Sequence, residues 1–292
     1  MPTDLRARTG LAYDDLPPRA AQDQALASAQ PDVRRPILLV HAGICDRRMW
    51  NPQLELLAAD RRVIRLDLRG FGTSDRKAPG AFAHHLEVAA LLDELGVTAA
   101  HLVGVSMGAG VVAEVAVARP DLVRSLLLVA PSGALRTEVT ADLEAFWEAE
   151  GEALAEEDLE RAVEANLETW LDGPRQASDR VDAAIRTFVG QMQLKAFENT
   201  DGWDDEEIEG AGLEPAVGTR AAEIRVPTRI LVGELDVVAV SQTATRLAGQ
   251  IPGASLVCWP DVAHLPSLER PDEFGALALD WFSQVEADAK PA

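Results

Sequence analysis

The stretch A-H-L-V-G-V-S-M-G-A-G-V-V-A-E-V-A-V-A-R, residues 100–119, decides the fold. Its first part is a short apolar run typical of a buried β-strand, and its second part has apolar residues at helical spacing. Ser106 stands at the junction, between Gly104 and Gly108. Such a pentapeptide often arises by chance, since glycine makes up about 7% of average proteins. The strand before it and the helix after it instead predict a tight turn that presents the serine hydroxyl.

The same alternation of short apolar runs and helical patterns continues on both sides of this stretch. Further strands are predicted at residues 36–43, 62–70, 123–133, 228–236 and 254–262. Fully apolar strands that alternate with helices indicate an α/β fold with a mostly parallel central sheet and helices on both faces. Residues 35–133 and 226–292 are therefore predicted to form one core domain. In residues 1–34 the pattern suggests at most one edge strand, within 11–24.

Residues 134–225 depart from this alternation, because helical patterns follow one another there without a strand between them. We expect a helical cap domain inserted between two strands, above the carboxyl edge of the sheet. Residues 134–222 hold 23 acidic and 7 basic residues, a net charge of −16 out of −21 for the whole chain. An acidic cap could attract a cationic substrate, but solvated helix faces are the commoner explanation of such a composition.

Composition excludes several classes of partner. The net charge of −21 argues against nucleic acid and anionic membranes. No apolar run approaches the ~20 residues of a membrane span, and residues 1–15 contain no apolar signal segment. Cys45 and Cys258, the only cysteines, provide neither a disulfide framework nor a zinc cluster. The sequence therefore predicts a cytoplasmic protein without a metal or organic cofactor, acting on a small molecule; its oligomeric state stays open.

A serine becomes a nucleophile only when a base takes its proton, and five histidines are available. His101 begins the strand that ends at Ser106, about 16 Å away at the usual rise per residue, which excludes it. His84 and His85 begin an amphipathic helix, where a solvated surface is expected. His264 follows the last strand, at the sheet edge where ligands of α/β folds bind, and is the predicted base.

The predicted acid that orients His264 is Asp236, just past the strand at 228–236. It lies between serine and histidine, the chain order that accompanies this type of turn. A turn or N-cap role would be the ordinary explanation of an aspartate at such a place. Glu234, two residues earlier, is expected to face the turn instead.

Acyl transfer also needs two backbone N–H groups directed at the developing oxyanion. Met107, at the start of the helix after the serine, is the first predicted donor. The loop after the strand at 36–43 should supply the second, and Gly43 is favoured over Ile44. Apolar side chains of the core loops and of the cap are candidates for the substrate pocket: Ile44, Trp50, Trp147, Trp170, Met192 and Leu265.

Taken together, the segments V-H-A-G-I-C-D-R-R-M-W, L-D-L-R-G-F-G-T-S-D, G-V-S-M-G-A-G and L-V-G-E-L-D with D-V-A-H-L-P-S-L-E-R-P-D-E-F resemble the α/β-hydrolase fold superfamily. The resemblance implies a serine hydrolase with a cap domain, most similar to the branch of esterases and 3-oxoadipate enol-lactonases. The chain departs from the family in having His41-Ala42 where His-Gly is usual, and in showing no pair of leading strands.

The residues and the resemblance together predict cleavage of a carboxylic ester or lactone through an acyl-enzyme. Alternatives on the same triad are a proline-iminopeptidase-like amide hydrolase, a C–C bond hydrolase, an acyltransferase and a cofactor-free oxygenase. A ligand receptor without catalysis is a further alternative. A serine at position 106 excludes the reactions that relatives of this fold perform with an aspartate nucleophile.

Overall fold

The computed structural model describes the chain except for residues 1–3, 20–33, 77–80, 204–207, 209 and 289–292. Within the described part, eight strands form one sheet in the order β1-β2-β4-β3-β5-β6-β7-β8. The strands from β3 to β8 are parallel to one another, as predicted. Their bounds, with those of the two leading strands, are β1 Leu5–Arg6, β2 Ala12–Leu16, β3 Ile37–Val40, β4 Val63–Leu66, β5 Ala100–Val105, β6 Val123–Val129, β7 Thr228–Gly233 and β8 Ser255–Trp259.

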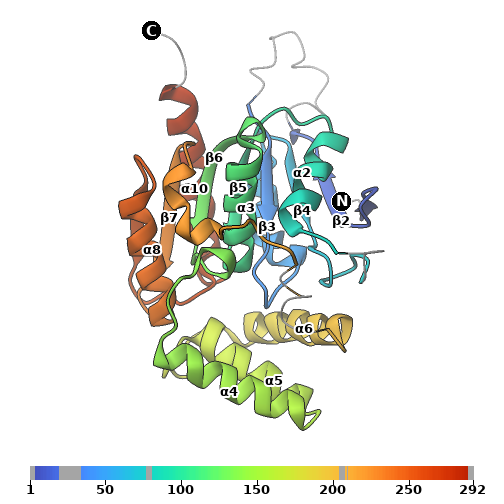
Figure 1. The fold of residues 1–292 in the computed structure, drawn as a ribbon, viewed down its shortest axis with the longest axis vertical. Coiled ribbons are helices and arrows are strands. Elements are labelled where there is room, and N and C mark those ends of the chain that lie inside the picture. The colour runs from blue at the N-terminus through green and yellow to red at the C-terminus, as the bar shows by residue number, and fades with distance from the viewer. Residues whose placement is uncertain (1–3, 20–33, 77–80, 204–207, 209, 289–292) are drawn as a thin grey trace.

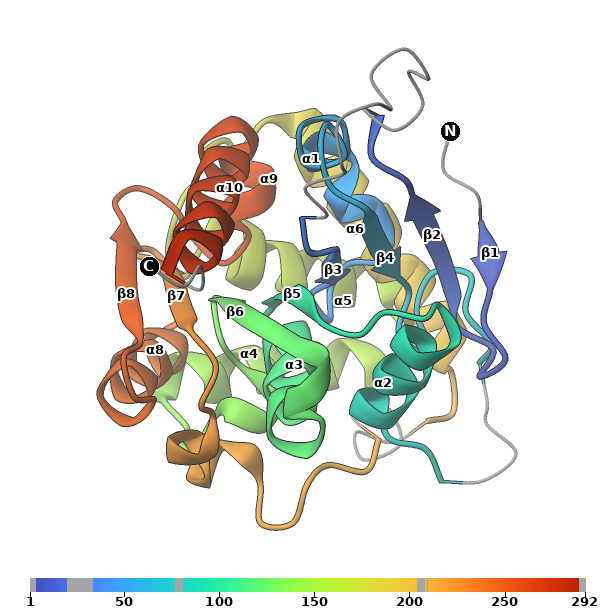
Figure 2. The same ribbon diagram turned by 90° about the horizontal axis from the view of Figure 1, so that it is seen from above.

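Helices cover both faces of the sheet (Figure 2). One face carries α1 and α10, which contact each other, and the other carries α2, α3 and α8. The bounds of these helices, with the short α9, are α1 Asn51–Leu57, α2 His84–Glu94, α3 Met107–Ala118, α8 Val238–Gln250, α9 Pro266–Glu269 and α10 Pro271–Asp288. Strands β3, β5 and β6 are almost wholly buried between these layers, which explains their nearly continuous apolar sequences.

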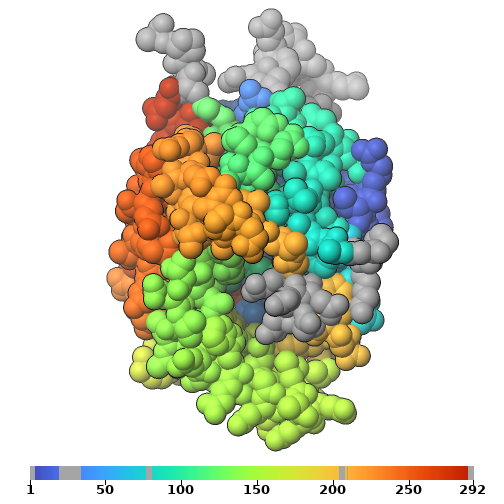
Figure 3. Space-filling view, viewed as in Figure 1, coloured from blue at the N-terminus to red at the C-terminus, as the bar shows by residue number. Residues whose placement is uncertain are grey.

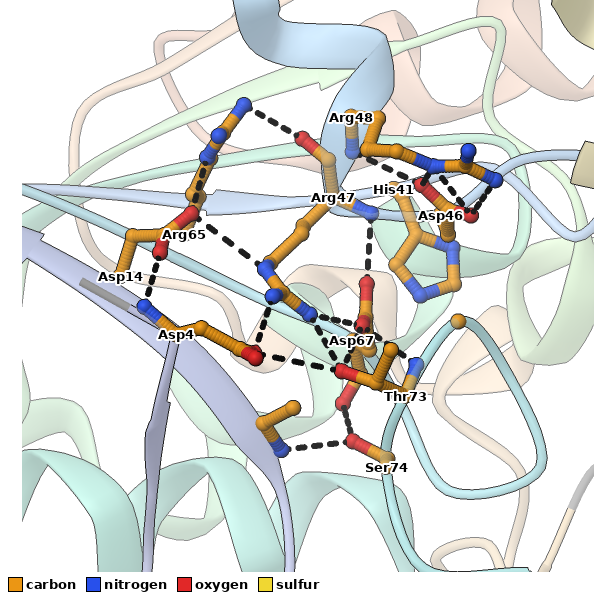
Figure 4. Close-up of polar contacts among 12 residues, drawn as sticks. Asp4, Asp14, His41, Asp46, Arg47, Arg48, Arg65, Asp67, Thr73 and Ser74 are labelled. Atoms are coloured by element: carbon orange, nitrogen blue, oxygen red, sulfur yellow. Dashed lines mark hydrogen bonds and ion pairs between the residues drawn. The ribbon is translucent and has the colours of Figure 1, made fainter. Parts of the chain in front are cut away.

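The N-terminal residues do supply two leading strands, so the expectation that this pair is absent was wrong. Strand β2 pairs antiparallel with β4, and β1 pairs antiparallel with β2. The apolar signal is weak in β2 because this strand carries buried charge: Asp14 is 1% exposed and binds Arg65 of β4 at 2.8 Å (Figure 4). Buried charges persist where they are paired. Apolar alternation therefore marks such a strand only weakly. The strand suggested within residues 11–24 is confirmed as β2, whereas β1, which pairs on its outer side, was missed.

Between β6 and β7 the chain forms a separate helical layer, at the bottom of Figure 1. It consists of α4 Ala141–Ala155, α5 Leu159–Asn166, a π-helical segment Leu167–Asp172 and α6 Ala183–Thr200. We call residues 134–225 the cap, as in the prediction. In the described ranges no helix is both long enough and apolar enough to cross a bilayer.

Candidate active site

Ser106 occupies a strained turn between β5 and α3. Its backbone has φ 56° and ψ −117°, a conformation that side-chain-bearing residues rarely adopt and that costs about 1–3 kcal/mol. Its N–H donates to the carbonyl of Val129 at 2.9 Å, so the neighbouring strand β6 holds the turn in place. Residues held in such conformations cluster at functional sites.

The two glycines of the G-x-S-x-G sequence are required by close packing. A Cβ on Gly104 would lie 2.2 Å from the carbonyl oxygen of Gly108. A Cβ on Gly108 would lie 2.5 Å from the carbonyl oxygen of His41, at the end of β3. Neither glycine has a positive φ, so close approach rather than backbone freedom demands them here. Together they let α3 start directly against β3 and β5.

His264 and Asp236 meet at the carboxyl edge of the sheet, on the loops after β8 and β7. The Nδ1 atom of His264 lies 2.9 Å from each carboxylate oxygen of Asp236. Both residues are buried, at 1% and 7% exposure. Because Asp236 occupies Nδ1, the second ring nitrogen, Nε2, is left to serve as the base. His264 and Ser106 line the same cavity.

The loop that carries His264 is fixed by Glu269, which sequence reasoning missed. Its carboxylate accepts hydrogen bonds from the N–H groups of Ala263 and Leu265, on either side of the histidine. Arg180 of the cap binds the same carboxylate at 2.6 Å. Burial raises the pKa of Glu269, against the hydrogen bonds and the charge of Arg180. The short spacing of the segment A-H-L-P-S-L-E was the available signal for this contact.

The predicted oxyanion donors are neighbours in space. Gly43 and Met107 both line the cavity, and a Cβ on Gly43 would lie 3.9 Å from Cβ of Met107. Among the described residues, no hydrogen bond uses the N–H of Gly43. Ala42, which replaces the usual glycine, does not have a positive φ. Alanine is therefore accommodated in this turn without backbone strain.

A cavity of about 910 Å³ lies between the cap and the core, and the surface is hollowed where the two meet (Figure 3). Its walls combine six aromatic side chains with aliphatic and polar ones, and the polar part includes carboxylates from the cap. The aromatic members are Phe71, Phe146, Trp147, Trp170, Phe197 and Trp203, and the polar members of the cap are Arg136, Glu150, Glu157, Asn166, Gln193 and Asp201. The aromatic ring of Trp170 lies 4.6 Å from the ring of His264, centroid to centroid, so the cap reaches the predicted base directly.

The predicted pocket residues divide into two groups. Ile44, Trp147 and Trp170 line the cavity. Three others belong to the core instead: Trp50, Met192 and Leu265. Trp50 is fully buried and packs against Phe274 of α10, with 6.0 Å between the rings. On α6 the cavity is lined by positions 193, 196, 197 and 200, and position 192 lies outside this stripe. These three residues were wrong predictions.

The expectation that His84 and His85 are solvated was also wrong. They are 2% and 4% exposed. His84 Nε2 lies 2.9 Å from the carbonyl oxygen of Ile208, and His85 lies 3.3 Å from the carboxylate of Glu114. The cap therefore covers the start of α2 at Ile208. Burial lowers the pKa of His84 to about 4.

His101 lies away from the cavity. Its side chain is fully buried and contacts Ser125 and Glu286. Its exclusion as the catalytic base from strand geometry agrees with this position.

The fold agrees with comparisons to known proteins. The model of the Alpha/beta hydrolase family matches residues 37–277, so this chain belongs to that family. It is 27% identical over 266 residues to a 2-hydroxymuconate semialdehyde hydrolase of Pseudomonas sp. strain CF600, a match that covers 87% of this chain and 89% of the relative.

Solved structures of related enzymes have the same fold. A thermophilic esterase from Thermogutta terrifontis superposes with a TM-score of 0.74 at 25% identity, covering 98% of each chain. The enol-lactonase from Burkholderia xenovorans LB400 superposes with a TM-score of 0.71 at 23% identity, covering 94% of this chain and 96% of that one. At this identity the enol-lactonase supports the fold alone.

Proposed function

We propose that the protein is a serine hydrolase that cleaves a carboxylic ester or lactone through an acyl-enzyme on Ser106. One observation carries the proposal: the hydrogen-bonded pair of His264 and Asp236 opens into the cavity that holds the strained serine. Family membership makes the chain a hydrolase, and the esterase among the solved relatives supports an oxygen ester as the bond attacked.

In this mechanism Ser106 attacks the carbonyl carbon while Nε2 of His264 takes the hydroxyl proton. Asp236 holds the imidazole in the required tautomer and stabilises the imidazolium. The N–H groups of Met107 and Gly43 bind the oxyanion, and the start of α3 adds the favourable end of its dipole. The imidazolium then protonates the leaving alkoxide, and His264 activates water against the acyl-enzyme.

The cavity walls favour a substrate that is apolar and does not carry a carboxylate. Six aromatic side chains and several aliphatic ones line the cavity, and they suit an apolar acyl or alcohol group. Among the described lining residues there are three carboxylates, those of Glu150, Glu157 and Asp201, and one guanidinium, that of Arg136. The guanidinium of Arg136 lies over the ring of Trp147, 4.7 Å from its centroid. Neutral and cationic esters should therefore bind better than anionic ones.

Two further observations each favour an alternative function. The cap carboxylates in the cavity could hold a substrate amine, as an amide hydrolase of the proline-iminopeptidase kind would require. The relative named 2-hydroxymuconate semialdehyde hydrolase favours hydrolysis of a dienoic keto acid on the same triad. The negative cavity weighs against the second of these, because that class of substrate carries a carboxylate.

A panel of substrates tests the proposal. It would contain p-nitrophenyl esters of graded chain length, a set of lactones, amino-acid p-nitroanilides and an anionic ester of matched size. We expect turnover of neutral esters or lactones with a burst of p-nitrophenol, and loss of the burst in Ser106→Ala. Ser283→Ala, an exposed serine on α10, serves as the matched control. Full turnover by Ser106→Ala, or turnover of the p-nitroanilides alone, would contradict the proposal.

A further inference from the structure

His41 begins the loop that carries Gly43, the second predicted oxyanion donor. Its imidazole ring makes hydrogen bonds to two backbone groups. It is fully buried at the end of β3. Its Nε2 lies 2.9 Å from the backbone nitrogen of Leu68, and its Nδ1 lies 2.8 Å from the carbonyl oxygen of Ala42. The N–H of Leu68 can only donate, so Nε2 accepts. The ring proton must then be on Nδ1, where it is donated to Ala42. These two contacts define a neutral ring with one tautomer.

The hydrogen bond to Ala42 fixes the peptide that joins Ala42 to Gly43. The carbonyl oxygen of Ala42 accepts from His41 and also from the N–H of Cys45 at 2.9 Å. The peptide is trans, so its carbonyl and its N–H point in opposite directions. Holding the carbonyl toward His41 turns the N–H of Gly43 to the other side, and Gly43 lines the cavity beside Met107.

The turn after β4, which contains Leu68, also binds the other end of the loop at residues 41–47. The backbone N–H of Arg47 donates to the carboxylate of Asp67 at 2.7 Å, and the guanidinium of Arg47 binds Asp67 as well (Figure 4). Asp67 immediately precedes Leu68. Residues 41–47 are therefore tied at both ends to one turn of the core, with the peptide of Ala42 and Gly43 between the two attachments.

We propose that His41 is a positioning residue for the oxyanion hole: its Nδ1–H, directed by the Leu68 contact, aims the N–H of Gly43 at the substrate carbonyl oxygen. The inference rests on the proposed function, since it assigns a direction to one of the two donors of that mechanism. His41 does not touch the substrate and acts through the peptide. Ala42 in place of glycine leaves this role intact, because the carbonyl and not the side chain of residue 42 is used.

The surroundings of His41 keep its ring neutral. Burial lowers the pKa of His41, and the nearby charge of Arg47 lowers it further. The carboxylates of Asp67 and Asp46 raise it, but by less than burial lowers it. The Leu68 contact requires a neutral ring, because Nε2 must accept the hydrogen bond.

Two substitutions separate the two contacts of the ring. His41→Asn keeps an N–H donor at the place of Nδ1, within reach of Ala42, but loses the acceptor for Leu68. His41→Gln can place an amide oxygen near the position of Nε2 for Leu68, but loses the donor to Ala42. The readout is the rate at which diethyl p-nitrophenyl phosphate modifies Ser106, because the phosphoryl oxygen occupies the oxyanion position and no natural substrate is needed.

We expect His41→Gln to slow this modification about 10- to 100-fold, somewhat less than the loss of a whole oxyanion donor, which costs about 10²–10³. His41→Asn should retain the rate within about fivefold. With an ester substrate, kcat should fall for His41→Gln while KM changes little. His101→Gln is the matched control: it also removes a buried histidine with two polar contacts, but far from the cavity. Its rate per folded molecule should equal that of the wild type.

Wild-type rates in His41→Gln, or equal losses in the Asn and Gln variants, would overturn the inference. Failure of the proposed function looks different, because the wild type itself would then not be modified at Ser106. In that event a crystal structure of His41→Gln still decides the inference. A peptide between Ala42 and Gly43 in its original orientation contradicts it, and a rotated peptide supports it.

Discussion

The Nδ1 atom of His264 lies 2.9 Å from each carboxylate oxygen of Asp236, and the two side chains come from loops after adjacent strands, β8 and β7. Parallel order brings both strand ends to one edge of the sheet. The ring of Trp170 packs on His264 from the cap. The core thus brings the predicted acid and the predicted base together, and a cap side chain packs against the imidazole.

Asp236→Asn should reduce kcat by about 10⁴-fold, because an amide favours the wrong tautomer of the catalytic histidine. KM should change little, since Asp236 does not line the cavity. Steady-state kinetics on the best ester of the panel would measure both constants. Glu234→Gln, an exposed carboxylate two residues earlier, is the control and should keep wild-type activity. Equal losses in the two variants would count against Asp236 as the orienting acid.

Gly104→Ala should prevent the turn at Ser106 from forming, because the added Cβ would lie 2.2 Å from backbone. We expect loss of activity together with a large drop in melting temperature or insoluble protein. Gly151→Ala is the matched control: it lies within helix α4, and a Cβ there meets nothing within 4 Å. It should raise stability by about 0.5–1 kcal/mol. Thermal unfolding and activity assays check both, and an active, stable Gly104→Ala would refute the packing argument.

Mild acid should destabilise the fold through two buried histidines. Burial lowers the pKa of His84 and of His101 to about 4 in each case, below the usual value near 6.5. The folded state favours the neutral rings. Their contribution to the free energy of unfolding is therefore complete above pH 6.5 and is lost as the pH falls toward 4. Each histidine should add a slope of about 1.4 kcal/mol per pH unit in that window.

Urea unfolding between pH 7 and pH 4 measures this slope. The double variant His84→Gln, His101→Gln should be less stable at pH 7 and should show a shallower dependence on pH. A slope identical to that of the wild type would place the acid sensitivity in other groups.

Asp14→Ala should destabilise the protein by about 3–5 kcal/mol, because it leaves Arg65 buried without its carboxylate. Arg65 is 3% exposed, so water cannot replace the lost partner. Urea unfolding again gives the free energy. Asp93→Ala breaks the largely exposed pair with Arg119 and should leave the melting temperature almost unchanged. Similar losses of stability in the two variants would contradict the claim that burial makes the Asp14–Arg65 pair more important than an exposed pair.

The parallel core was predictable because its central strands β3, β5 and β6 are buried on both faces and are therefore nearly continuously apolar in sequence. The serine turn was predictable because glycine spacing reports a close approach of backbones at Gly104 and Gly108. Strand β2 was indicated only weakly within residues 11–24, since the partner of its buried Asp14 is Arg65, far along the chain.

The pocket was less predictable than the sheet. Whether Trp50 or Trp147 faces the cavity depends on how helices pack, and periodicity gives one face of a helix without saying what lies opposite. Glu269 escaped notice because its partners are backbone N–H groups, which no residue type marks, so its short spacing from His264 was the available signal. The burial of His84 depends on a distant segment near Ile208 that covers the start of α2.

Active-site labelling tests the central claim most directly. The wild type, Ser106→Ala and Asp236→Asn would each be treated with a fluorophosphonate and analysed by intact-mass and peptide mass spectrometry. The account predicts a single adduct per wild-type chain, on Ser106, none in Ser106→Ala, and slow labelling of Asp236→Asn. An unlabelled wild type, or an adduct that persists in Ser106→Ala, would contradict it.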